Sequence, residues 1–292
     1  MKYLAEYLIN HNEDNWIDLA CTSNKASAEK LALITPQLKA SYSNHGTILK
    51  NATNKPQNSV HLPNKEMLID FYERPPKSYK DQLAEKRNKH DIEECPFCGQ
   101  SIKPTTLDHF LPKDTWPEYA IFQNNLIPQC TSCAPIKGKD YYCDNKKIAK
   151  FISPFHSNLL SIILFKIEVD FNEHTKRLTA KVSIKSEKEL AQDDIKRIKE
   201  HFSSLDIERR LVSYCNSEYR FICRKLKSVN FDILEFIQAK IKFKANPEKD
   251  WESSFYLAIM KNKNLIEYFK SINSKYHKKI NIENKAAFDI EL

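Results

Sequence analysis

Glycine is scarce in this chain: its 292 residues include 3, where average usage predicts roughly 20. This scarcity argues against a Rossmann domain with glycine-rich loops, and no P-loop motif is present. Long apolar runs are missing too, since the longest, 159–165, has seven residues including a serine. A transmembrane helix needs about twenty. We therefore expect no membrane span, and the N-terminal sequence predicts no secretion signal.

The chain is rich enough in apolar residues, at 41%, to exclude disorder along its whole length. Its 46 Lys and Arg against 38 Asp and Glu give a net charge of +8, which is compatible with a nucleic-acid partner without requiring one. Disulfide scaffolds are short, secreted chains, and this one is long and lysine-rich. We therefore expect a cytoplasmic protein whose paired cysteines bind metal.

The composition divides the chain into three predicted segments. Residues 1–90 are mostly helical in pattern, 91–150 form a turn-rich unit with six prolines and two of the glycines, and 151–292 combine a β-hairpin with helices. The predicted helices are 3–10, 27–38, 79–90, 207–226, 231–243 and 251–269, with a loop over 41–64 and hairpin strands at 162–171 and 178–184. The predicted fold class is α+β, mainly helical.

Four of the eight cysteines form two C-x-x-C pairs, Cys95 with Cys98 and Cys130 with Cys133. Such spacing lets each pair place two thiolates on one ion, and zinc takes four of them tetrahedrally. The 31 residues between the pairs exceed the 15 to 20 of simple zinc ribbons. Gly99 supports a zinc knuckle because such a turn often needs a positive φ. The alternative is a set of unpaired buried cysteines.

Between the pairs, Asp108 and His109 are adjacent. A carboxylate can hold a hard divalent cation, and an imidazole can take a proton from water at neutral pH. On a strand the two side chains point to opposite faces, so one site needs a backbone turn, which Pro112 makes plausible. The alternative is a surface Asp-His pair without a function.

In chain order the elements are Cys95/Cys98, Asp108-His109 with Pro112, Asn125-Leu126, Cys130/Cys133 and Lys137-Gly138. This arrangement resembles the HNH endonuclease family, over about 45 of the 292 residues. The resemblance implies a central ββα-metal core stapled by zinc on the four cysteines. It also implies metal-dependent hydrolysis of phosphodiester bonds in nucleic acid.

The resemblance implies a role for each matching residue. His109 would be the general base, Asp108 would bind a catalytic Mg²⁺ or Mn²⁺, and Asn125, rather than the adjacent Asn124, would brace the loop that orients His109. The helix of the core would begin near Asn125 and carry Cys130 and Cys133. Three lysines near the site have two interpretations, as phosphate ligands or as ordinary solvated side chains: Lys113, Lys137 and Lys139.

One position departs from the family pattern. The residue after the last cysteine is usually Asn or His and is the second metal ligand, but here it is Ala134. Asp140, Asn124 or His156 could replace it, the nuclease could be naturally weakened, or the alanine could have been introduced to inactivate it. If nothing replaces the ligand, the chain should bind Mg²⁺ poorly, and Asn or His at 134 should restore binding.

The layout also resembles the HNH nucleases of Septu and retron-linked anti-phage systems, as does the stretch FISPF at 151–155. That resemblance implies an ABC/SMC-like ATPase as protein partner and a role as effector of a bacterial defence complex. The substrate stays open between DNA and RNA, including tRNA. The second hypothesis is a catalytically weakened, zinc-dependent module that binds nucleic acid or a partner.

Overall fold

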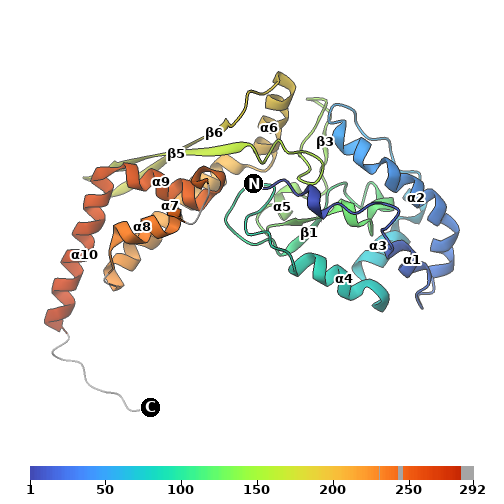
Figure 1. Cartoon of the computed structure of the whole chain (residues 1–292), viewed down its shortest axis with the longest axis horizontal. Coiled ribbons are helices and arrows are strands. Elements are labelled where there is room, and N and C mark those ends of the chain that lie inside the picture. Colours follow the sequence, from blue (N-terminus) through green and yellow to red (C-terminus); the bar gives the residue numbers. More distant parts are fainter. Residues whose placement is uncertain (230, 243–245, 284–292) are drawn as a thin grey trace, which may run out of the picture. The chain divides into compact units, whose positions relative to one another are not determined.

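The computed structural model describes residues 1–229, 231–242 and 246–283, and groups them into two compact units (Figure 1). Unit 1 comprises Met1–Ile163 with Ser186–Ile207, and unit 2 comprises Leu164–Lys185 with Glu208–Leu292. The predicted division at residues 90 and 150 stays a prediction. Within the described residues, no helix has both the length and the apolar character that crossing a membrane requires.

Unit 1 surrounds a small hairpin with helices. Its elements are α1 (Trp16–Cys21), α2 (Ala28–Lys50), α3 (Lys65–Glu73), α4 (Lys77–Asn88), β1 (Thr106–His109), β2 (Leu126–Gln129), α5 (Ala134–Lys137), β3 (Tyr142–Cys143), β4 (Ile148–Ala149) and α6 (Gln192–Ser204), with single 3₁₀ turns at Ala5–Tyr7, Leu62–Asn64, Pro117–Tyr119 and Gln123–Asn125. The predicted helix at 3–10 is wrong, because only the 3₁₀ turn forms there.

Helix α2 continues through the segment that we predicted as a loop. Its buried face repeats at Leu38, Tyr42, His45 and Leu49, which is the three-and-four spacing of an amphipathic helix. Burial of these side chains outweighs the low helix propensity of the Asn- and Ser-rich sequence around them. The helix therefore ends at Lys50 rather than at 38.

Strands β1 and β2 pair antiparallel, with Thr106 opposite Gln129 and His109 opposite Leu126. Every residue of β2 is buried. The prediction that the helix of the core begins near Asn125 is therefore wrong. Asn125 ends a 3₁₀ turn, β2 follows it, and the helix starts only at Ala134, after both cysteines of the second pair.

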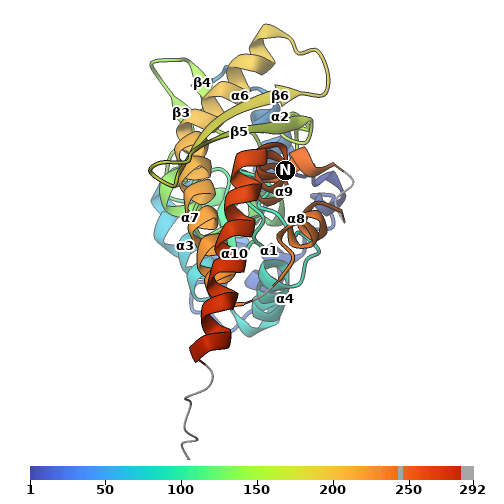
Figure 2. The same cartoon turned by 90° about the vertical axis from the view of Figure 1, so that its left-hand side faces the viewer.

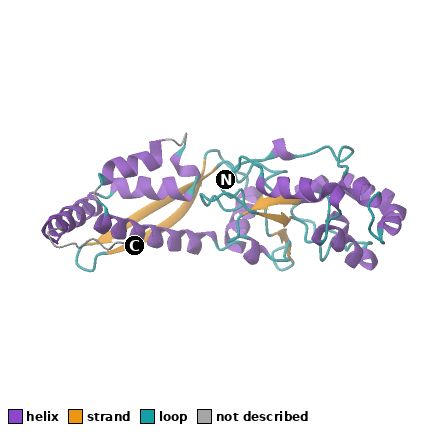
Figure 3. Ribbon diagram, turned by 90° about the horizontal axis from the view of Figure 1, so that it is seen from below, coloured by secondary structure: helices purple, strands orange, loops and turns teal. Residues whose placement is uncertain are grey.

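Unit 2 packs a long hairpin with helices, and the two strands stand out in Figure 3. The elements are β5 (Ile163–Asn172), β6 (Arg177–Ser186), α7 (Ile207–Ser228), α8 (Ile233–Lys242), α9 (Trp251–Lys261) and α10 (Lys263–Glu283), with a 3₁₀ turn at Pro247–Lys249. The predicted hairpin is confirmed. Figure 2 shows α7 beside α10, where the rings of Tyr219 and Phe269 lie 6.0 Å apart.

The predicted helix over 251–269 is two helices. Asn262 separates them, because its Oδ1 accepts a hydrogen bond from the Leu265 amide at 3.0 Å and caps α10. Its Nδ2 donates to the carbonyl of Val169 in β5 at 2.8 Å. The break thus fixes the hairpin against the helices. The mainly helical α+β class, with small two-stranded sheets, is confirmed.

Candidate functional site

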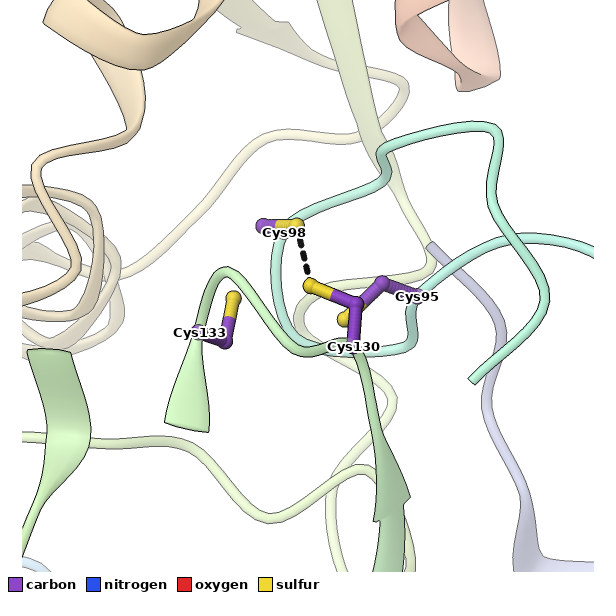
Figure 4. A group of neighbouring side chains, drawn as sticks. All are labelled: Cys95, Cys98, Cys130 and Cys133. Carbon is purple, nitrogen blue, oxygen red and sulfur yellow. Dashed lines mark hydrogen bonds between the residues drawn. The ribbon is translucent and has the colours of Figure 1, made fainter. Parts of the chain in front are cut away.

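The four paired cysteines come together in one cluster, from two segments of the chain (Figure 4). Their Sγ atoms all lie within 4.8 Å of one another, and those of Cys98 and Cys130 are 3.9 Å apart. Four thiolates about 2.3 Å from one ion stand about 3.8 Å from each other. All four side chains are buried. The cluster could therefore hold a zinc ion, as the spacing predicted.

Tight turns shape both halves of the cluster. Gly99 has φ of 73°, and its amide donates to the Cys95 carbonyl at 2.8 Å, which confirms the predicted positive φ. In the second half, the Cys133 and Ala134 amides donate to the Cys130 carbonyl at 3.1 and 3.2 Å. Hydrogen bonds from its neighbours lower the pKa of Cys130, whereas burial raises the pKa of Cys98. A divalent cation is needed to ionise all four thiols together.

Helix α6 fixes the first knuckle through His201. Its Nε2 donates to the Phe97 carbonyl at 2.6 Å, and its Nδ1 accepts from the Ile152 amide at 3.1 Å. Burial lowers the pKa of His201 to about 4, so the ring is neutral and both bonds persist at neutral pH. The segment 151–155 is thereby tied to the cysteine cluster.

A cavity of about 410 Å³ opens on the β1–β2 hairpin. The residues that line it are Ile69, Glu73, Leu107, Asp108, His109, Pro112, Lys113, Asp114, Gln129, Ala134, Gly138 and Lys139. Strand β1 ends at His109, so Asp108 and His109 both reach one cavity, as a single site requires. The structure also brings Ala134 to this cavity.

His109 is held in one tautomer. Its Nε2 lies 2.9 Å from the carbonyl oxygen of Ala120, which can only accept a hydrogen bond. The proton is therefore on Nε2, and Nδ1 keeps its lone pair. Burial lowers the pKa of His109 to about 3, so the ring is neutral. Tyr72 packs edge-on against it, with ring centroids 4.3 Å apart.

Asp108 forms an ion pair with Lys137, whose Nζ lies 3.1 Å from Oδ2. The lysine is buried, and the same Nζ donates to the His109 carbonyl at 3.1 Å. Burial raises the pKa of the Asp108 carboxyl, and Lys137 opposes this shift. The aspartate keeps 10% of its side chain exposed.

Asn125 ties together the loop between the strands. Its Oδ1 accepts from the Leu111 amide at 2.8 Å, and its Nδ2 donates to the carbonyls of Leu111 and Tyr119 at 3.0 and 3.2 Å. Tyr119 directly precedes Ala120, whose carbonyl fixes the tautomer of His109. The neighbouring Asn124 instead binds the backbone of Ile9. These contacts fit the bracing role that was expected of Asn125.

Ala134 offers only a methyl group to the cavity, and none of the three proposed substitutes lines the cavity within the part of the chain that the structure describes. Asp140 pairs with Lys150 at 2.6 Å. His156 packs against His45 with ring centroids 5.5 Å apart, and Asn124 is bound to Ile9.

The three predicted phosphate-binding lysines differ in their surroundings. Lys113 pairs with Glu73, and the exposed Lys139 pairs with Asp114 at 2.7 Å. Lys137 is buried against Asp108, so phosphate contact stays a prediction that depends on the two lining lysines.

Sequence reasoning missed Glu73, Asp114 and Gln129 in the cavity. Glu73 comes from α3, far along the chain, and nothing in the sequence places it there. Gln129 did carry a signal, because it is a polar residue in the otherwise apolar strand LIPQ.

Comparisons with known proteins give one weak relative. The chain is 26% identical over 166 residues to Protein ea31 of Escherichia phage lambda, which covers 51% of this chain and 54% of that protein. The chain thus spans about half the length of the curated relative that it matches. No family model matches the chain, and no solved structure matches it.

Proposed function

We propose that this protein is a metal-dependent endonuclease of the HNH type, with its active site in the cavity of about 410 Å³. The observation that carries the proposal is the meeting of Asp108, a tautomer-locked His109 and Ala134 in one cavity beside the four-cysteine cluster. The order of the five motif elements, which resembles that of the HNH family, also supports it.

The base in this mechanism is Nδ1 of His109. Its lone pair can accept a proton from a water molecule, because Nε2–H is committed to Ala120. Its pKa of about 3 makes the isolated ring a weak base. An anionic phosphate in the cavity would raise that pKa, since opposite charge favours the imidazolium. Asn125 positions the ring by holding the loop that supplies the Ala120 carbonyl.

The donor set fits a hard divalent cation such as Mg²⁺ or Mn²⁺. Asp108 supplies a carboxylate whose side chain is 10% exposed and whose Oδ2 lies 3.1 Å from the Lys137 ammonium, which the cation would have to share or displace. Such a cation, when bound, would stabilise negative charge on the phosphate and on the leaving 3′ oxygen. Lys113 and Lys139 at the rim could contact neighbouring phosphates.

A cleavage assay tests the proposal. Duplex DNA, single strands and tRNA would be incubated with the chain in Mg²⁺, Mn²⁺ or EDTA. We expect cleavage that EDTA abolishes and that Ala134→Asn increases, because an amide oxygen is added to the metal site. Ile136→Asn is the matched control, since it makes the same change at an exposed position of α5.

The second candidate is a zinc-dependent binding module without catalysis. Two features favour this candidate. Ala134 offers the cavity a methyl group rather than a metal ligand, and the Asp108 carboxylate is already ion-paired with Lys137. Absence of cleavage by both the chain and Ala134→Asn, on all substrates, would defeat the enzyme proposal and leave this one.

The ATPase partner of a defence complex belongs to the proposal as well. Within the described part of the chain, unit 2 contributes no side chain to the cavity, so it is available for a partner. Co-expression with an ABC/SMC-like ATPase followed by size-exclusion chromatography tests this: a deletion of unit 2 should abolish co-elution.

A further inference from the structure

Gln129, the last residue of β2, is a buried amide without partners. Its side chain is fully buried, and neither Oε1 nor Nε2 has a hydrogen-bond partner among the residues that the structure describes. Burying an amide without a hydrogen bond costs stability, and an apolar side chain of similar shape would avoid that cost. An unpaired carboxamide in a native site therefore calls for a ligand or a functional reason.

The register of the hairpin places Gln129 beside Asp108. Gln129 is opposite Thr106, and Asp108 is two residues further along β1. Side chains two residues apart share one face of a strand, so Gln129 and Asp108 are diagonal neighbours on the same face. Such neighbours have their Cα atoms about 7–8 Å apart, within reach of long side chains. Both residues line the same cavity.

Gln129 differs from the other oxygen-bearing side chains around the cavity. Glu73 is paired with Lys113, and Asp114 accepts from Lys139 and Lys65. Asp108 Oδ2 is ion-paired with the Lys137 ammonium, 3.1 Å away. Gln129 therefore lines the same cavity as Asp108 and Ala134, and its carbonyl oxygen has no hydrogen bond among the described residues.

We propose that Oε1 of Gln129 is a ligand of the divalent cation held by Asp108, and that it replaces the donor missing at Ala134. The inference rests on the proposed function, since it assumes that the cavity binds such a cation. An amide oxygen is a hard donor of the kind that Mg²⁺ and Mn²⁺ accept. Movement of this side chain toward the cavity on binding would give its carbonyl a partner.

The test is Mn²⁺ binding, followed by electron paramagnetic resonance of the free ion during a titration. Full-length, zinc-loaded protein would be used in buffer freed of other metals, with zinc content checked by elemental analysis. Gln129→Leu should raise the Mn²⁺ Kd at least 10-fold. Its melting temperature without Mn²⁺ should equal or exceed that of the unchanged chain, because a buried unpaired amide has been removed. Gln129→Glu should lower the Kd.

An unchanged Kd in Gln129→Leu would overturn the inference. If Gln129→Leu raises the Kd but also lowers the melting temperature, the weaker binding could come from a damaged fold. Gln129→Glu is then the deciding variant, and if it does not bind Mn²⁺ more tightly than the unchanged chain, the inference is overturned. Asp108→Asn distinguishes failure of the proposed metal site from failure of the role of Gln129. If it abolishes binding while Gln129→Leu does not, only the role of Gln129 fails. If neither the unchanged chain nor Ala134→Asn binds Mn²⁺, both the role of Gln129 and the proposed metal-dependent function are refuted.

Discussion

At His109, a single hydrogen bond decides which ring nitrogen can act as a base. The Ala120 carbonyl accepts a hydrogen bond from Nε2–H, which keeps the proton on Nε2 and leaves Nδ1 as the acceptor. Asn125 acts at one remove, because it holds the loop around that carbonyl through four hydrogen bonds to Leu111, Tyr119 and His45. The proposed mechanism therefore depends on Asn125, a residue that takes no part in the proton transfer itself.

Loss of the base should abolish cleavage without disturbing the fold. In an Ala134→Asn background, His109→Ala should reduce the cleavage rate by roughly 10²- to 10⁴-fold, the usual cost of removing a general base. Zinc content and melting temperature report on the fold. His174→Ala, in the exposed turn of the hairpin, is the matched control. Unchanged cleavage by His109→Ala would remove this histidine from the mechanism.

A pair of histidines outside the cavity, His45 and His156, makes stability depend on pH. Burial lowers the pKa of His45 to about 3 and that of His156 to about 4, from 6.5. Below pH 6.5 the unfolded chain binds protons that the folded chain does not, so the free energy of unfolding falls as pH falls. The contribution is fully present above pH 6.5 and is lost progressively down to about pH 4 for His156 and about pH 3 for His45.

His156→Gln should flatten this dependence, by up to about 1.4 kcal/mol per pH unit between pH 6 and 5. Urea denaturation at several pH values measures it, with zinc content confirmed at each. His174→Gln, at an exposed position in the hairpin turn, is the matched control. Equal slopes for His156→Gln and the unchanged chain would contradict the prediction.

At the scale of elements, the cysteine knuckles and the β1–β2 hairpin organise unit 1. The knuckle turns bring Cys95, Cys98, Cys130 and Cys133 to within 4.8 Å, and β2 leads directly into the second knuckle. An ion bound there would connect the segment before β1 to the segment after β2. The geometry of the cavity would then depend on the four-cysteine cluster beside it.

Breaking the cluster should therefore unfold the core rather than slow a reaction. Cys98→Ser should lose zinc and the cooperative unfolding of unit 1, because structural zinc contributes on the order of 10 kcal/mol to folding in small metal-bound units. Cys143→Ser, a cysteine outside the cluster, is the control and should keep both. Elemental analysis and circular dichroism are the measurements. A folded, zinc-free Cys98→Ser chain would refute this role.

Local patterns predicted the elements that local chemistry determines. The Cys-x-x-Cys spacing, the positive φ at Gly99 and the long hairpin could all be predicted from neighbouring residues. The end of α2 could not be predicted in this way, because the residues at 41–50 are mostly polar and their few buried side chains form an apolar face only in contact with the rest of unit 1. The same holds for the cavity, where Glu73 arrives from a separate helix. The strand at Leu126–Gln129 could have been recognised, since Pro128 opposes a helix there.

At the scale of the whole molecule, the chain passes between the two units three times, after residues 163, 185 and 207. Unit 2 is therefore discontinuous in sequence. Its hairpin is fixed to its helices by stacking of Phe171 on Tyr268, with ring centroids 4.8 Å apart, and by the Tyr219 hydroxyl, which donates to the Lys176 carbonyl at 2.7 Å. The helices alone leave this face uncovered.

Two fragments test whether the hairpin is essential. Residues 208–292 contain the helices without the hairpin and should aggregate or unfold without cooperativity, because their apolar face lacks its cover. Residues 164–292 should unfold cooperatively and give dispersed amide resonances. Thermal denaturation and two-dimensional NMR compare them. Equal stability of the two fragments would show that the hairpin is dispensable.

The buried ion pair between Lys137 and Asp108 gives the chain an internal competitor for the metal site proposed at Asp108. The ammonium is attached to the chain, so its effective concentration at the carboxylate is fixed, whatever the concentration of dissolved cations. The pair is neutral, which removes the long-range attraction that an isolated carboxylate would exert on a dication. Any dication at Asp108 has to share the carboxylate with this ammonium or displace it. Lys137 therefore raises the dication concentration that half-occupies the proposed site.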